Sequence, residues 1–187
     1  MTKATPDPTL AALIPQPSRR RNGALAALAV ALLAGAWFAA PVLHPDLRQD
    51  AFGDIGPFKD VPASLIRVTA AGALTIERVT GTESTEVAGA WIVPDADGWA
   101  RLTDEYSPSA TPEDLLRASG INPDAAALPQ SLADGETVWL MVAWHVTDCP
   151  TVDLTSWGDV TVRSPLGIER TLPLDGGGPV SVFDVCG

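Results

Sequence analysis

The sequence predicts a mainly β protein, in which an antiparallel β-sandwich with a short helical insertion follows one N-terminal transmembrane helix. Three observations predict this fold class. A run without any charged residue, 23–43, follows three consecutive arginines. About seven short segments rich in β-branched residues come after it, separated by turns that contain glycine and proline. One later segment, which starts at Thr111-Pro112, has instead the pattern of a helix N-terminus.

The charge-free run 23–43 predicts a helix that spans a membrane. As a helix it would reach about 31 Å, which matches the hydrocarbon core of a bilayer. The arginines at 19–21 stay in the cytoplasm by the positive-inside rule, so residues 1–22 form a cytoplasmic tail and the rest lies outside. A cleaved signal peptide ending near Ala34-Gly35-Ala36 is the other interpretation. The apolar core of a signal peptide is about 7–15 residues long, whereas the run 23–43 has 21 residues. We therefore favour an uncleaved anchor.

Residues 44–187 carry 8 basic and 22 acidic side chains, a net charge of −14. Such a domain repels phosphates, which excludes nucleic acid as a partner. Solubility explains the acidity, and an acidic docking face for a basic partner is the alternative. Lysine occurs only at positions 3 and 59, whereas Ala, Gly, Pro and Arg are abundant. This balance is typical of a GC-rich bacterial genome, so we expect the bacterial cytoplasmic membrane.

The first half of the outer part divides into a linker and a group of strands. Five prolines and glycines in residues 44–62 predict a juxtamembrane linker without regular structure. The sandwich domain then occupies residues 63–187. Its first strands are expected at 65–69, 74–79 and 86–93, with a short returning strand at 99–102.

A helical insertion is predicted at about 108–130. Thr111 is placed as the N-cap, Pro112 as the first helical residue, and Glu113 and Asp114 lie in the first turn. Gly120 is expected to end this helix. A second short turn opens at Asn122.

Residues 137–149 form the strongest predicted strand. Both of its faces are largely apolar, which predicts a central strand covered on both sides, with the inserted helix on one of them. Further strands are expected at 160–163, 168–172 and 180–185. Pro165-Leu166-Gly167 predicts a hairpin between the first two.

The segment 132–136, the long strand that ends in Asp148-Cys149, the hairpin at 165–167 and the terminal Val185-Cys186 carry a resemblance. Over roughly residues 130–187 the chain resembles the immunoglobulin-like domains of uncharacterised membrane-anchored bacterial proteins. The resemblance implies an immunoglobulin-like sandwich outside the membrane. It implies no catalytic residue.

Cys149 and Cys186 are the only cysteines, and both lie in the part predicted to be outside the cell. A disulfide between them is the expected arrangement in an oxidising compartment. A redox-active pair is the alternative, but such pairs usually have the spacing C-x-x-C.

Other candidate chemistry is sparse. His145 could serve a metal site or a hydrolase, but the only other histidine is His44. The segment 95–98 partly resembles a calcium loop and is interpreted as a turn, because Tyr106 stands at the twelfth position. The carboxylate pair Asp104-Glu105 could serve a glycosidase. Nucleophile, phosphate-binding and dinucleotide-binding motifs are absent from the sequence.

These observations predict a non-enzymatic binding or structural module, without cofactor or metal. The membrane would be contacted through residues 23–43, and the partner would be an envelope protein or polymer. Two other interpretations stay open. The chain could be an accessory subunit of a membrane complex, or an extracytoplasmic hydrolase of unknown type that uses His145.

Overall fold

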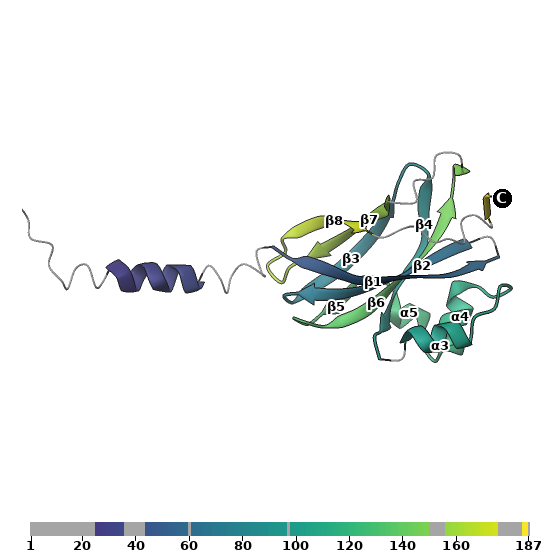
Figure 1. The fold of residues 1–187 in the computed structure, drawn as a ribbon, viewed down its shortest axis with the longest axis horizontal. Coiled ribbons are helices and arrows are strands. Elements are labelled where there is room, and N and C mark those ends of the chain that lie inside the picture. The colour runs from purple at the N-terminus through teal and green to yellow at the C-terminus, as the bar shows by residue number, and fades with distance from the viewer. Residues whose placement is uncertain are drawn as a thin grey trace, which may run out of the picture. The chain divides into compact units, whose positions relative to one another are not determined.

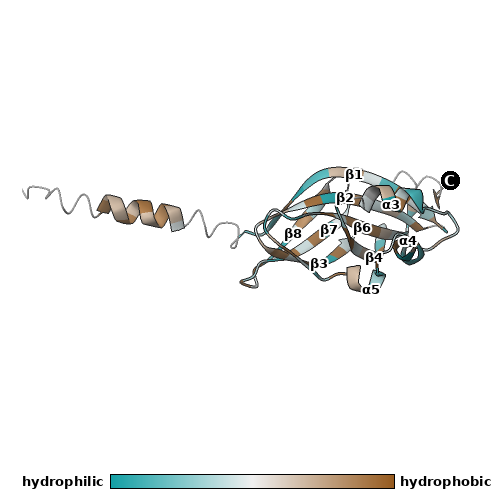
Figure 2. Cartoon of the chain, turned by 90° about the horizontal axis from the view of Figure 1, so that it is seen from below, coloured by the Kyte–Doolittle hydropathy of each residue, from teal (hydrophilic) through white to brown (hydrophobic). Residues whose placement is uncertain are grey.

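The computed structural model describes residues 25–35, 44–59, 61–96, 98–149, 156–175 and 185–186. The chain divides into two compact units, Met1–Ala39 and Ala40–Gly187. In the first unit, residues 25–35 form an apolar helix (Figure 2). No helix within these described ranges is both long and apolar enough to cross a membrane. The predicted tail 1–22 and the rest of the predicted span, 23–24 and 36–43, lie outside the described residues.

The second unit is mainly β, with two antiparallel sheets and short helices (Figure 1). In chain order its described elements are β1 (Asp46–Phe58), β2 (Val61–Ala71), β3 (Leu74–Gly81), β4 (Thr85–Pro94), α3 (Gly98–Asp104), α4 (Pro112–Ala118), α5 (Pro123–Ala126), β5 (Gln130–Leu132), β6 (Thr137–Val146), β7 (Ser156–Arg163) and β8 (Glu169–Asp175). Sheet A has the strand order β1-β2-β6-β4, and sheet B has the order β5-β3-β7-β8.

The inner faces of the two sheets share one hydrophobic core, to which all strands except β4 contribute fully buried or nearly buried side chains. Trp144 on β6 and Trp157 on β7 meet across it edge to face, with ring centroids 5.9 Å apart. The Trp144 indole N–H donates to the Ser64 hydroxyl at 3.0 Å, which satisfies both groups inside the core. Figure 2 shows apolar residues recurring along the strands of both sheets.

A second core lies between the outer face of sheet A and the helices. Met141 and Ala143 of β6 are fully buried there, together with Leu102, Leu115 and Leu116 from the helices. The alternate residues of β6 face the core between the sheets instead. The sequence predicted a central strand that is covered on both faces, with the inserted helix on one of them. This prediction is confirmed for β6.

The helix start at Thr111 is also confirmed. Its hydroxyl accepts from the backbone N–H of Asp114 at 3.2 Å, and the Asp114 carboxylate accepts from the Thr111 N–H at 3.3 Å.

The insertion begins earlier than predicted, because residues 98–104 form α3. The strand expected at 99–102 is therefore wrong. Gly98 and Leu102 are both buried, one helical turn apart, whereas Ala100 and Arg101 are exposed, and that spacing fits a helix and not a strand.

The linker predicted at 44–62 is wrong, because residues 46–58 form β1 and pair with β2. β1 lies at the edge of sheet A, so only one of its sides needs a continuous hydrogen-bond ladder. Its ladder shifts register between Ile55 and Phe58, and this irregularity takes up Gly56 and Pro57. The breaking residues thus fit a strand that sequence composition alone does not indicate.

The hairpin predicted at 165–167 is confirmed as the turn between β7 and β8. The strand predicted at 180–185 lies almost wholly outside the described residues, and Val185 with Cys186 forms a short helical turn.

The antiparallel registers place four segments at one end of the sheets, which we call the N-proximal end. They are the start of β1, the β2–β3 turn, the β5–β6 loop and the β7–β8 hairpin. The opposite end, with the β1–β2 turn and the end of β6, is the distal end.

Candidate functional site

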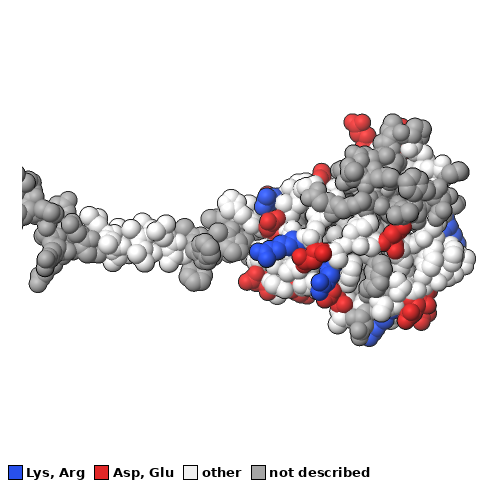
Figure 3. Space-filling model, in the orientation of Figure 1, with Lys and Arg blue, Asp and Glu red and all other residues white. Residues whose placement is uncertain are grey.

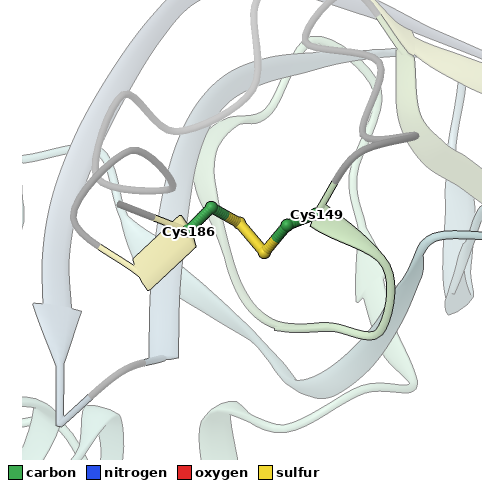
Figure 4. The surroundings of a disulfide bond; sticks show 2 residues. All are labelled: Cys149 and Cys186. Atoms are coloured by element: carbon green, nitrogen blue, oxygen red, sulfur yellow. A yellow bond between two sulfur atoms is a disulfide. The ribbon is translucent and has the colours of Figure 1, made fainter.

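Cys149 and Cys186 form a disulfide, with their Cα atoms 5.6 Å apart (Figure 4). This confirms the predicted pairing. Cys149 follows the end of β6 at the distal end, and Cys186 packs half-buried against the core between the sheets. The bridge thus ties the last described residue to the central strand, which is a structural use of both thiols.

The structure keeps the two histidines apart. His145 is exposed near the end of β6, opposite Glu86 on β4, and so lies toward the distal end. His44 comes just before β1 at the N-proximal end. No group of three or more potential metal ligands occurs among the described residues. The geometry therefore gives no support to a metal site or a hydrolase that uses His145.

Asp95, the first acid of the supposed calcium loop, is held by an arginine. Its two carboxylate oxygens accept from the Arg67 guanidinium at 2.8 and 2.9 Å. This hydrogen-bonded ion pair lowers the pKa of Asp95 below its usual value and raises that of Arg67. Arg67 lies on β2, so the pair joins β2 to the turn after β4 across β6. Asp95 acts as a structural anchor, while Asp97 lies outside the described residues.

Asp104 and Glu105 lie at the end of α3, beside a groove of about 320 Å³ that the end of α4 also lines. Both carboxylates are exposed to solvent. A glycosidase needs one carboxyl group that burial keeps protonated, so this adjacent and exposed pair lacks the required difference in environment.

A larger groove, of about 450 Å³, runs along the end of β4 and α5. Its polar side chains already bind the protein itself. Asp95 holds Arg67, the Glu136 carboxylate accepts from the Ala133 N–H at 2.7 Å, and Gln130 donates to backbone carbonyls at 2.7 and 2.8 Å. A third groove of about 320 Å³ lies between β3 and β4, where Trp91 and Leu128 contribute apolar surface. These grooves offer surface for a partner and no free set of reacting groups.

The β7–β8 hairpin tip is the feature that sequence reasoning missed. Leu166 is 67% exposed and Ile168 is 37% exposed, at the N-proximal end. The sequence signal was available, since two large aliphatic residues occupy a turn where polar ones are common. Whether these two side chains are exposed or buried is decided by the packing of the two sheets, which the turn sequence does not indicate.

Comparison of the chain with protein-family models and with curated proteins finds no match.

Proposed function

We propose that this chain is a single-pass membrane protein that displays a non-enzymatic, immunoglobulin-like binding or structural module on the outer side of the bacterial cytoplasmic membrane. The observation that carries the proposal is the strand order of the two sheets. The disulfide and the sequence of residues 19–43 support the location. The partner would be an envelope protein or polymer.

The strand order supports the immunoglobulin-like part of the proposal. In that fold one sheet contains strands A, B, E and D in spatial order, and the other contains C, F and G. Taking β1 to β4 as A to D, and β6, β7 and β8 as E, F and G, reproduces the order of sheet A and the sequence β3-β7-β8 in sheet B. The remaining strand, β5, follows the helical insertion and adds to the free side of β3. This extra strand and the helices are departures from the common pattern.

The position of the disulfide also departs from that pattern. An antibody domain joins strands B and F inside the core, whereas here the bridge joins Cys149, the third residue after β6, to Cys186. Disulfides persist in oxidising compartments and are rare in the cytosol. A bridge in the second unit therefore favours the outer side of the membrane, the same side that the arginines at 19–21 favour through the positive-inside rule.

A binding or structural role is favoured over catalysis by the state of the polar groups. The acids that line the groove of about 450 Å³ hold an arginine and a backbone N–H, and the exposed carboxylate pair at α3 has no buried member. A module of this kind acts through its surface. The accessory-subunit interpretation belongs to the same class and differs only in the partner.

The proposal is tested on the full chain in bacterial cells. Membranes are washed with alkaline carbonate, and the thiols are alkylated with and without prior reduction. We expect the chain to stay with the membrane and both cysteines to react only after reduction. A chain that the wash releases, or thiols that react without reductant in whole cells, would contradict the proposal.

A further inference from the structure

We propose that the tip of the β7–β8 hairpin, residues 164–168, rests on the surface of the lipid bilayer that anchors the chain. This inference depends on the proposed function, because it requires residues 23–43 to span the membrane. It assigns an interaction surface to the domain and names lipid as what the surface contacts.

The first observation is the exposure of the tip. Among the described residues of the second unit, the exposed large hydrophobic side chains are Phe52, Leu166 and Ile168. Two of these three lie at one hairpin tip. Single exposed apolar residues are normal on a protein surface, but here two lie two positions apart at one hairpin turn.

The second observation is the order of the tip. The Gly167 N–H donates to the Ser164 carbonyl at 2.9 Å, and the Ser164 N–H donates to the Ile168 carbonyl at 2.9 Å. The Ile168 N–H also donates to the hydroxyl of Ser164, which is buried. The turn is thus fixed by its own hydrogen bonds. Leu166 is presented in a defined position, and little conformational entropy would be lost on contact.

The third observation is the position of the tip relative to the start of β1. The Arg170 guanidinium lies 3.6 Å from the Asp46 carboxylate, and the Gln49 side chain donates to the Pro173 carbonyl at 2.8 Å. Asp46 follows the last residue of the predicted span, Leu43, by three positions, a reach of at most about 11 Å. If residues 23–43 span the membrane, this short connection limits how far the N-proximal end, which includes the hairpin tip, can lie from the membrane surface.

Part of the negative charge at the N-proximal end is held by nearby donors, although Glu169, which follows the tip, is exposed. Although the second unit is acidic, Glu77 accepts from Arg163 at 2.6 Å, Asp46 pairs with Arg170, and Asp134 accepts from the Gly72 N–H at 2.8 Å. Figure 3 shows basic and acidic side chains next to one another at this end of the unit. The contact is consequently apolar, and it should occur on zwitterionic lipid. Because the anchor would hold the domain next to the bilayer, the effective concentration of the lipid surface at the hairpin tip is high, and even a weak contact would be made by a large fraction of the molecules.

The test places an environment-sensitive dye at the tip of the full chain. Both native cysteines are bridged, so Leu166→Cys gives a single reactive thiol. Ser109→Cys is the matched control, since Ser109 is exposed in a loop that binds the β1–β2 turn at the distal end through Lys59. Each variant is labelled with nitrobenzoxadiazole and reconstituted into phosphatidylcholine vesicles, with and without doxyl-labelled lipid. Ile168→Cys provides a second position at the tip.

We expect the dye at 166 and 168 to shift its emission to the blue and to lose about half of its intensity to the doxyl lipid, with no change at 109. If the chain floats with the vesicles but all three dyes behave alike, the hairpin contact is wrong and the anchor stands. If the tip dye is shielded from iodide but not quenched by doxyl lipid, a second protein copy covers the tip, and the inference is overturned. A chain that does not float overturns both this inference and the proposed function.

Discussion

Arg67 and Asp95 connect two strands that are not neighbours in sheet A. Arg67 stands opposite Trp139 of β6, and Asp95 follows the end of β4 on the other side of that strand. Both side chains keep about a third of their surface exposed, at 38% and 32%. The hydrogen bond from Arg67 is the largest cause and lowers the pKa of Asp95. Burial comes next and opposes it, while the charge of Arg67 and a hydrogen bond with Trp139 lower the pKa further.

The pair makes stability depend on pH in a defined direction. Because the pKa of Asp95 is lowered in the folded state, its contribution is complete above the unfolded value of about 3.9 and is lost as pH falls through the folded pKa. Asp95→Asn should therefore lower the free energy of unfolding at pH 7, and its difference from wild type should shrink below about pH 4.

Urea unfolding of the two chains between pH 7 and pH 3 measures this difference. Glu105→Gln is the control, since it removes an exposed carboxylate that makes no ion pair among the described residues. A difference between Asp95→Asn and wild type that stays constant over the whole range would show that the ion pair has no role in stability.

At the scale of elements, the insertion of α3, α4 and α5 acts as a cover for sheet A. Leu115 and Leu116 of α4 are almost completely buried against the outer face, whereas the next residue, Arg117, is exposed. The helix itself is short, so packing and its capping box hold it in place, not its own propensity.

Truncating the buried face of α4 should therefore be costly. Leu116→Ala should lower the free energy of unfolding by about 3 kcal/mol, because it leaves a cavity in the second core. Arg117→Ala, one residue further, removes only an exposed ion pair with Asp114 and should change the value by less than about 0.5 kcal/mol. Equal effects of the two substitutions, measured by chemical denaturation, would mean that α4 does not pack on the sheet.

The sequence was sufficient for the elements whose signal is local. The alternating apolar faces predicted β6 as a covered central strand, and Thr111 with Asp114 predicted the start of α4. β1 was missed because Gly53, Gly56 and Pro57 are tolerated at a sheet edge, and edges are set by tertiary pairing. For the same reason the sequence could not join Arg67 to Asp95, which are 28 positions apart.

The candidate surfaces divide in the same way. The cysteine pair and the hairpin turn were predicted from residue type and spacing. The exposure of Leu166 was not, because a turn residue points to solvent or to a neighbouring loop according to how the two sheets pack. Its nearness to the start of β1 follows from the strand registers and from the contacts of Arg170 with Asp46 and of Gln49 with Pro173.

At the scale of the whole molecule, the disulfide ties the chain end to the distal end of the sheets. It closes a loop with a sequence separation of 37, which includes β7 and β8. Reduction should lower the free energy of unfolding by up to about 4 kcal/mol in the chain-entropy model. Denaturation with and without reductant measures this, and the double variant with serine at 149 and 186 should not respond to reductant. A wild-type chain whose stability is unchanged by complete reduction would contradict this role.

The central claim is that residues 44–187 lie outside the cytoplasm, held to the membrane by residues 23–43. Fusing alkaline phosphatase, which is active only outside the cytoplasm, to Gly187 tests it most directly, with green fluorescent protein at the same position as the reciprocal reporter. We predict an active phosphatase fusion and a dark fluorescent one, because Arg19, Arg20 and Arg21 hold the tail inside. A fluorescent fusion together with an inactive phosphatase would contradict the orientation and the account built on it.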